Sequence, residues 1–305
     1  MFEAHRLNYT TMKHIISIFL LSLLGATVAV AGEQIRPGQT ITYKTLESSE
    51  LKLHVFNPPG HVPSDQSPVI VFFFGGGWAG GTPRQFYQQA RDFAELGFVA
   101  ISAEYRTKRT HKTTPFECVE DGKSAIRWVR QHANELGIDP NRIISAGGSA
   151  GGHVAACTGV IEGHEAEGED LSVSSMPNLL ILYNPVIDTT EAGYGLNAVT
   201  EARKTELSPC HHVRAGLPPT LIFHGTADSE VPFENVERFT ALMTEAGNDC
   251  SLVAFEGKRH GFFNGSFFRP KSSDVDYGAA MAHGVEFLTK QGYLPVVSSG
   301  DGAGL

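Results

Sequence analysis

Short runs of consecutive apolar residues alternate along most of the chain with longer amphipathic segments. Because neighbouring side chains of a strand point to opposite faces, a continuous apolar run buries both faces of its sheet. Strands of this kind that alternate with helices are typical of a mostly parallel sheet with helices on both faces. The predicted strands are residues 69–74, 98–103, 143–146, 179–183, 220–224 and 252–255.

The segments around these strands predict the covering helices and one hairpin. One helix start is well marked, with Thr82 as the N-cap, Pro83 at the first position and Gln85 three residues after the cap, as in a capping box. The insertion between the strands 179–183 and 220–224 is short, so any cap on the domain is small. We therefore expect an α/β fold with a mostly parallel central sheet, helices on both faces and a small cap. The expected helices are residues 83–96, 116–136, 153–161, 233–246 and 274–291, and the expected antiparallel hairpin pairs residues 40–45 with 51–56.

Charge and composition exclude several classes of protein. The 305 residues include 24 Lys and Arg against 33 Asp and Glu, a formal net charge of -9 at pH 7. This excludes a protein that binds nucleic acid through bulk positive charge. Apolar residues make up 41% of the chain, which is too high a share for a disordered protein. Beyond the N-terminal region no uncharged apolar run is long enough to span a bilayer, which excludes a multi-span membrane protein.

The N-terminal region has the pattern of a secretory signal peptide. Lys13 and His14 precede an apolar run at residues 15–24, and the sequence Ala-Val-Ala at residues 29–31 has the form of a cleavage site. We expect a secreted or periplasmic protein, with an N-terminal membrane anchor as the alternative. The expected division of the chain is a signal peptide at residues 1–31, one domain at 32–294 and a flexible, Ser- and Gly-rich tail at 295–305.

The cysteines indicate neither a metal site nor redox chemistry. They are widely spaced and form no C-x-x-C pair, so disulfides are permitted but not specified. Adjacent residues such as Cys210, His211 and His212 cannot easily converge on one ion, and we expect no metal. The four cysteines after residue 31 are Cys118, Cys157, Cys210 and Cys250, of which the first two fall on predicted helices.

A glycine-rich turn with a central serine lies between a predicted strand and a predicted helix. Residues 147–152 read Gly-Gly-Ser-Ala-Gly-Gly, directly after the strand 143–146 and directly before the helix 153–161. A serine on such a turn is held in a strained conformation with its hydroxyl exposed, and the glycines let the chain pass closely. Ser149 is therefore the candidate nucleophile. A glycine turn that only joins the strand to the helix is the alternative.

A serine nucleophile needs a base, and the base needs an acid that orients it. Asp228 lies in the loop after the strand 220–224, and His260 lies beside a glycine in the loop after the strand 252–255. We therefore expect Asp228 to be the acid and His260 to be the base. The alternatives are Glu230 or Asp188 for the acid and His153 or His224 for the base, the two histidines being expected to have structural roles.

A second glycine-rich loop follows the strand 69–74. Residues 74–78 read Phe-Gly-Gly-Gly-Trp, and such a loop can direct backbone N–H groups at an oxyanion. The N–H of Ala150, directly after the candidate nucleophile, is a second donor. Trp78 is a candidate substrate contact, with a packing anchor as the alternative.

Together these motifs resemble the acetyl esterase and hormone-sensitive-lipase-like branch of the α/β-hydrolases, in which the nucleophile, acid and base follow one another in this order. The resemblance extends from the strand 69–74 through the helix 274–291, with matching sequences at 75–78, 103–106, 147–152, 228–232 and 260–262. It implies an oxyanion hole made by Gly76, Gly77 and Ala150, and a triad of Ser149, Asp228 and His260. The family usually has His where this chain has Phe74, which leaves open how the oxyanion loop is held.

The resemblance implies a carboxylic ester hydrolase that needs no cofactor. With the signal peptide and the small cap, it favours short acyl esters, such as acetyl or feruloyl groups on plant or algal polysaccharides. The alternatives are a serine peptidase of the prolyl-oligopeptidase type, a lipase and a non-catalytic binding module. We expect no nucleic-acid partner and no stable membrane insertion once the signal is removed, and the sequence specifies no oligomeric state.

Overall fold

The computed structural model describes residues 34–296, and its strands form one eight-stranded sheet within them. The predicted signal peptide at 1–31 and most of the predicted tail at 295–305 lie outside these residues. The strand order is β1-β2-β4-β3-β5-β6-β7-β8. The strands are β1 Gln39–Thr45, β2 Glu50–Phe56, β3 Ser67–Phe73, β4 Val99–Ala103, β5 Ile138–Gly148, β6 Leu179–Tyr183, β7 Thr220–Gly225 and β8 Cys250–Phe255.

The pairing confirms a mostly parallel sheet. β1 and β2 form the expected antiparallel hairpin, and β2 also pairs antiparallel with β4. All other neighbours, from β4 through β3 to β8, are parallel. The carboxyl ends of β3, β5, β7 and β8 therefore meet at one edge of the sheet, where the loops with the candidate site residues begin.

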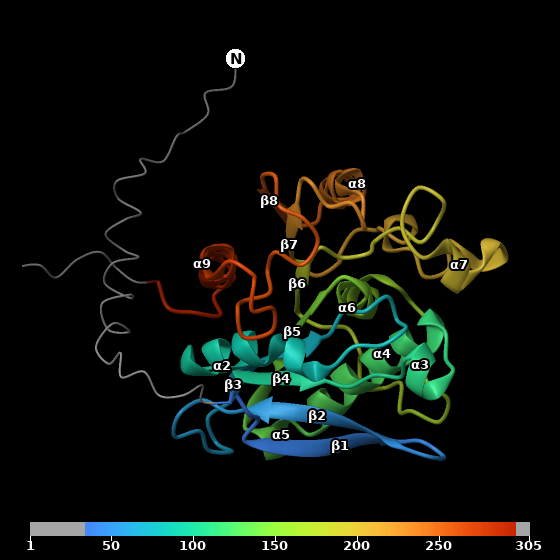
Figure 1. Ribbon diagram of the computed structural model, residues 1–305. Helices are drawn as coiled ribbons and strands as arrows, with labels where there is room; N and C mark the ends of the chain where they lie inside the picture. Colours follow the sequence, from blue (N-terminus) through green and yellow to red (C-terminus); the bar gives the residue numbers. More distant parts are fainter. Residues whose placement is uncertain (1–33, 297–305) are drawn as a thin grey trace, which may run out of the picture. The chain divides into compact units, whose positions relative to one another are not determined.

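Helices cover both faces of the sheet. Figure 1 shows α2 and α9 on one side of the strands, and α4 and α6 on the other. Within the described residues no helix is both long and apolar enough to cross a bilayer. The helices are η1 Pro83–Phe86, α2 Tyr87–Glu95, α3 Lys108–His111, α4 Pro115–Gln131, α5 Ala133–Leu136, α6 Ala150–Val160, α7 Leu196–Val199, η2 Glu201–Arg203, η3 Pro209–His211, α8 Phe233–Glu245 and α9 Asp274–Lys290.

Three predicted helix boundaries differ from the structure. The helix expected at 83–96 opens as a 3-10 turn, η1, before α2 begins. The helix expected at 116–136 is interrupted at His132, whose φ of -100° and ψ of 23° are not helical, and it continues as α5. The helix expected at 153–161 already begins at Ala150, because the glycines after Ser149 take helical conformations.

The consecutive apolar residues of β3 are buried on both faces of the sheet, as predicted. On β3, Phe72 stacks on Phe86 at a ring-centroid distance of 4.9 Å, on the side of α2. The next side chain, Phe73, points to the other face and joins a cluster with Val119 of α4 and Val154 of α6. Phe72 and Phe73 are fully buried, and burying a phenylalanine side chain contributes about 1.5–3 kcal/mol. Alternate residues of one strand thus fill two cores.

Ion pairs of two buried side chains anchor the middle of α4. Asp121 is fully buried and accepts hydrogen bonds from Lys44 of β1 at 2.7 Å and from Arg106 at 2.7 and 2.8 Å. Arg127, one and a half turns further on, pairs with Glu165 and donates to the carbonyl of Val173 at 2.8 Å. These charges tie the hairpin and the long loop after α6 to α4. All four cysteines in the described part of the chain are free thiols, and only Cys250 among them is partly exposed.

Candidate active site

Ser149 occupies the sharp turn between β5 and α6. Its φ of 56° and ψ of -122° lie outside the regions that L residues ordinarily adopt. Its N–H donates to the carbonyl of Tyr183 on β6 at 2.9 Å, and its own carbonyl accepts from the N–H of His153 at 3.0 Å. Strain of this kind persists only where the surroundings fix it, and it clusters at functional sites.

The glycines around Ser149 are required by close backbone approaches. A Cβ atom on Gly151 would overlap the carbonyl oxygens of Phe73 and Phe74 at the end of β3. A Cβ atom on Gly147 would overlap the carbonyl of Gly151 in the same way. Because these neighbours are backbone atoms, they cannot rotate aside as a side chain does. The turn therefore lies directly against the start of the second glycine-rich loop.

We expect Gly151→Ala to lower the free energy of unfolding by about 3 kcal/mol, the upper end of the range for overpacking, because the backbone of Phe73 cannot yield. Gly278→Ala is the matched control, since a Cβ atom there meets nothing within 4 Å and the residue lies on α9. In a helix this exchange raises stability by about 0.5–1 kcal/mol. Urea denaturation of both variants measures the difference, and equal effects would contradict the close approach.

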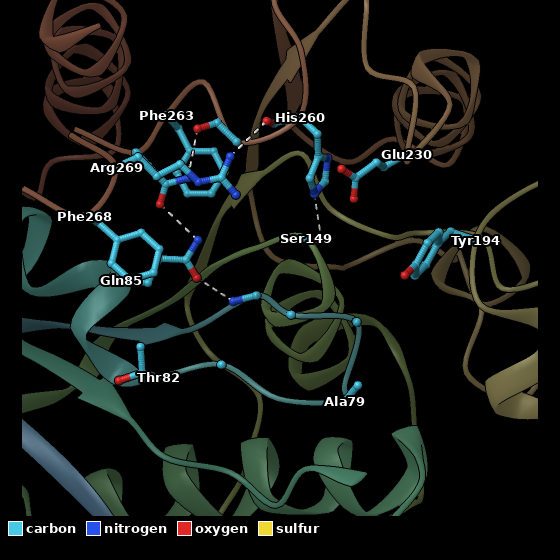
Figure 2. Close-up of a pocket in the computed structure, with 16 residues that line it drawn as sticks. Ala79, Thr82, Gln85, Ser149, Tyr194, Glu230, His260, Phe263, Phe268 and Arg269 are labelled. Atoms are coloured by element: carbon cyan, nitrogen blue, oxygen red, sulfur yellow. Dashed lines mark hydrogen bonds between the residues drawn. The ribbon is translucent and has the colours of Figure 1, made fainter. Parts of the chain in front are cut away.

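His260 lies between Ser149 and Asp228. Its Nε2 is 2.9 Å from Ser149 Oγ, and its Nδ1 is 2.7 Å from Asp228 Oδ2. Figure 2 shows the imidazole pointing down at Ser149 from the loop after β8. Since the carboxylate accepts the Nδ1 proton, Nε2 is left to accept the proton of the serine hydroxyl. The structure thus brings together the three residues that the sequence predicted as nucleophile, base and acid.

Asp228 is held as an ion by a ring of donors. Its Oδ1 accepts the N–H groups of Glu230 at 2.9 Å and Val231 at 3.1 Å. Its Oδ2 accepts from Asn184 Nδ2 at 2.6 Å in addition to His260. Burial by itself raises the pKa of Asp228, but the hydrogen bonds from the neighbouring histidines, Asn184 and the loop backbone outweigh it and hold the pKa well below its usual range. The carboxylate is therefore ionised throughout the neutral range.

His224 supports Asp228 from inside the sheet. It is fully buried at the end of β7, and its Nε2 is 3.2 Å from Asp228 Oδ2 and 3.0 Å from the carbonyl of Val231. A nitrogen that faces two acceptor oxygens carries a proton, so His224 donates to the carboxylate and does not compete with His260 as a base.

Asp188, Glu230 and His153 take no part in this hydrogen-bonded series through their side chains. Asp188 is buried and paired with Arg238, and it accepts from Thr190 N–H at 2.8 Å. Glu230 is exposed at the rim of a cavity over Ser149. His153 is fully buried, where its Nε2 donates to the carbonyl of Leu207 at 2.7 Å. Burial lowers the pKa of His153 to about 4, although the bond to that carbonyl raises it. His153 is thus a neutral structural group.

The second glycine-rich loop passes close to Ser149 and carries backbone N–H groups that have no acceptor among the described residues. Gly76 and Gly77 have φ angles of 134° and 61°, conformations that glycine adopts readily. Among residues 34–296, no acceptor pairs with the N–H of Gly76, Gly77 or Ala150, the three donors that the resemblance implies. A Cβ atom on Gly75 would lie 3.1 Å from Ser149 Cβ, which shows how closely the loop approaches the serine.

The cavity over Ser149 has a volume of about 400 Å³ and a mixed lining. Figure 2 shows Arg269, Phe263 and Phe268 along one wall, with Tyr194 and Glu230 on the opposite side. Tyr194 comes from the insertion between β6 and β7, which otherwise carries only short helices. Besides Ser149 and His260, the polar lining side chains are Thr82, Gln85, Tyr194, Glu230, Asn264 and Arg269.

Comparison with known proteins agrees with this geometry. The BD-FAE family model matches residues 53–191, and the model of the dienelactone hydrolase family matches residues 177–285. Carboxylesterase NlhH of Mycobacterium tuberculosis is 30% identical over 258 residues, which cover 78% of each chain. The chain belongs to the α/β-hydrolase esterases. It lies in the branch similar to hormone-sensitive lipase and is a carboxylic ester hydrolase.

Two further relatives bear on the esterase. Thermogutta terrifontis esterase 2, in a form phosphoramylated by tabun, is 45% identical with a TM-score of 0.81, covering 87% of this chain and 99% of that one. A probable isoprenylcysteine alpha-carbonyl methylesterase of Oryza sativa subsp. japonica is 30% identical over 219 residues. The esterase spans 52% of that plant protein's length, and the match covers 65% of the esterase.

Phe74 of the esterase is held by stacking and by one hydrogen bond. Its ring stacks on Tyr105 at a centroid distance of 4.2 Å, and the Tyr105 hydroxyl donates to the Phe74 carbonyl at 2.6 Å. Trp78 is buried and donates from Nε1 to His153 Nδ1 at 3.3 Å. It lines a second cavity, of about 270 Å³, beside α7. A contact between Trp78 and substrate stays a prediction.

The sequence did not identify three polar residues of the esterase site, Asn184, Gln85 and Asn264, or the support that His224 gives to Asp228. Asn184 and His224 lie at the carboxyl ends of β6 and β7, next to the loop that carries Asp228. Their position at this edge of the sheet could have indicated a role beside Asp228. The capping box expected for Gln85 is wrong. Thr82 caps η1 by accepting from Arg84 N–H at 3.4 Å, while the Gln85 side chain points away to tertiary partners.

Proposed function

We propose that the protein is a secreted serine esterase that removes short acyl groups, such as acetyl or feruloyl groups on polysaccharides, through an acyl-enzyme. The observation that carries the chemistry is the hydrogen-bonded series Ser149–His260–Asp228, with distances of 2.9 and 2.7 Å. This series lies on a strained turn opposite a loop whose N–H donors have no partner among residues 34–296.

In the acylation step, Ser149 Oγ attacks the ester carbonyl carbon while His260 Nε2 takes the hydroxyl proton. Asp228 holds the Nδ1 proton and stabilises the imidazolium that forms. The N–H groups of Gly76, Gly77 and Ala150 stabilise the oxyanion. When the intermediate collapses, the bond to the alcohol oxygen breaks and His260 returns its proton to that oxygen. Water then attacks the acyl-enzyme while His260 takes a proton from it. The bond to Ser149 Oγ breaks, the acid leaves and His260 returns the proton to Oγ.

The cavity supports a short acyl group and a polar alcohol. Its volume of about 400 Å³ must hold parts of both. Hydroxyl, carboxylate and guanidinium groups at its wall, from Thr82, Tyr194, Glu230 and Arg269, suit a hydrated alcohol better than a long alkyl chain. Thermogutta terrifontis esterase 2, at 43% identity, is known in propionate-bound and butyrate-bound forms. Its forms phosphonylated by sarin and phosphorylated by paraoxon support an activated nucleophile in this family.

Secretion is supported by the order of charged, apolar and small residues in 1–31, and an acyl group on an extracellular polysaccharide is a substrate met in that compartment. Export of a reporter fused behind residues 1–31 tests this part on its own; retention of the reporter in the cytoplasm would contradict it.

The test of the substrate class is a series of p-nitrophenyl esters from acetate to decanoate, followed by acetylated xylan. We expect kcat/KM to be highest for acetate to butyrate and to fall by about 10-fold or more at decanoate, because the cavity cannot bury the longer chain. Acetylated xylan should be a better substrate than a simple aryl acetate. A preference for long chains would indicate a lipase, and xylan rates no better than those on the aryl acetate would contradict the polysaccharide proposal.

A further inference from the structure

Gln85 joins two loops of the site that the sheet leaves far apart. The oxyanion loop follows β3 and the loop of His260 follows β8, while β5, β6 and β7 lie between these strands in the sheet. No strand pairing therefore sets the spacing between the two loops. Gln85 is 7% exposed, accepts the Gly75 N–H on Oε1 at 2.6 Å and donates from Nε2 to Asn264 Oδ1 at 3.0 Å. Figure 2 shows both bonds.

Asn264 determines which atoms of the Gln85 amide donate and which accept. Asn264 is fully buried, and both its Nδ2 and its backbone N–H donate to the Gly261 carbonyl, at 2.9 and 3.1 Å. Its Oδ1 must therefore be the group that faces Gln85, and Gln85 must donate through Nε2. That leaves Gln85 Oε1 as the acceptor for Gly75. Each side-chain amide of the bridge thus has one permitted orientation.

The bridge ends beside reacting groups on both sides. Gly75 directly precedes the proposed oxyanion donor Gly76, and Gly261 directly follows His260. The turn at Gly261, with a φ of 81°, sets the direction in which the chain leaves the histidine. The Tyr105 hydroxyl also holds the oxyanion loop, through its hydrogen bond to the Phe74 carbonyl. Tyr105 follows β4, so this bond does not connect the oxyanion loop to the histidine loop.

We propose that Gln85 and Asn264 are positioning residues that hold the oxyanion donors in register with His260. The proposal rests on the proposed roles of Gly76, Gly77 and His260. Gln85 Oε1 and Nε2 and Asn264 Oδ1 and Nδ2 all have partners within the protein, so neither amide is needed to bind substrate in the proposed role. The transition state needs both, because oxyanion donors and the base act on the same carbonyl group, and a displacement of about 1 Å between them lowers the rate by about 100-fold.

The test compares two variants that each disturb one hydrogen bond of this connection with a third that removes both bonds of Gln85. Gln85→Glu keeps an acceptor for Gly75 but places a carboxylate oxygen against Asn264 Oδ1. Asn264→Asp keeps an acceptor for Gln85 but places an oxygen against the Gly261 carbonyl. Gln85→Ala removes both bonds. We expect kcat on p-nitrophenyl acetate to fall by about 10–100-fold in each variant, with KM changed by less than about 3-fold.

Gln89 is the matched control. It lies on α2, is buried, and its Nε2 donates to the Phe263 carbonyl at 3.3 Å, so it ties the same histidine loop to the same helical segment. It has no bond to the oxyanion loop. Gln89→Ala should therefore keep kcat within about 3-fold of the parent enzyme, although it also removes a buried side-chain hydrogen bond to the histidine loop.

A second measurement separates positioning from stability. A trifluoromethyl ketone adds to the serine and places an oxyanion where the transition state has one. Its affinity should fall in proportion to kcat/KM across the Gln85 and Asn264 variants, and the double variant Gln85→Ala, Asn264→Ala should be no slower than the slower single variant. Unchanged kcat with a lowered Tm, or equal losses in Gln89→Ala, would overturn the proposal. Activity of the parent enzyme and of Gln89→Ala verifies the proposed function separately.

Discussion

Replacing Ser149 with alanine is expected to lower kcat on p-nitrophenyl acetate by about 10⁴–10⁶-fold. The variant keeps the Cβ atom and the backbone of the turn, so the fold and the cavity stay intact. It loses the oxygen that forms the acyl-enzyme, and His260 then has no hydroxyl to deprotonate. The residual rate is what the oxyanion donors alone provide for attack by water.

Ser145 offers a matched control on β5, the strand that ends directly before Ser149. It is fully buried on β5 and accepts from the Thr158 hydroxyl at 3.1 Å, away from His260. Ser145→Ala should leave kcat within about 3-fold of the parent value, while thermal melting confirms that both variants fold. Ser149→Ala activity within 100-fold of the parent enzyme would show that another group is the nucleophile.

Asp228→Asn is expected to lower kcat by about 10⁴-fold. The carboxyl group is surrounded by donors alone, from Asn184, His224, His260 and the loop backbone. The asparagine side chain must turn its NH2 group, itself a donor, toward some of these donors. Where it faces His260, it favours the imidazole tautomer with the proton on Nε2, which cannot accept the proton of Ser149.

Glu230→Gln is the comparison for this variant. Glu230 is in the same loop and is, with Asp188, one of the two alternative acids that the sequence offers. Its side chain is exposed, and its backbone N–H donates to Asp228 at 2.9 Å. We expect Glu230→Gln to keep kcat within about 5-fold, since it removes one charge at the rim. Steady-state rates at neutral pH distinguish the two residues, and similar losses in both variants would contradict the assignment of Asp228.

The sequence predicted the parallel part of the sheet well because the core of β3, β4, β6 and β7 is apolar at consecutive positions, a pattern typical of strands that are buried on both faces. It also predicted which three side chains meet, because parallel strands end at the same edge and the loops after β5, β7 and β8 carry them there. Their catalytic roles stay predictions until the variants are measured. The signal peptide at 1–31 and the tail at 295–305 stay predictions as well.

Tertiary contacts explain what the sequence did not predict. Helix α6 begins at Ala150 and includes Gly151 and Gly152, although glycine is a poor helix former. The close approach of the end of β3 explains why position 151 is glycine, since no larger residue fits there. Gln85 matches a local capping pattern, yet its partners are Gly75 and Asn264, of which Asn264 is 179 positions away. A pattern of four residues holds no information about a partner so distant. The contact of His224 with Asp228 was likewise hidden, because His224 ends an apolar strand.

The insertion between β6 and β7 separates two properties of the enzyme that evolution can change independently. Of the described residues that line the cavity over Ser149, Tyr194 alone comes from this insertion. The nucleophile, the base, the acid and the oxyanion donors all follow other strands. Beyond Asn184, which donates to Asp228, the insertion can therefore change in length or sequence and alter the wall of the cavity while the groups that move the proton keep their positions.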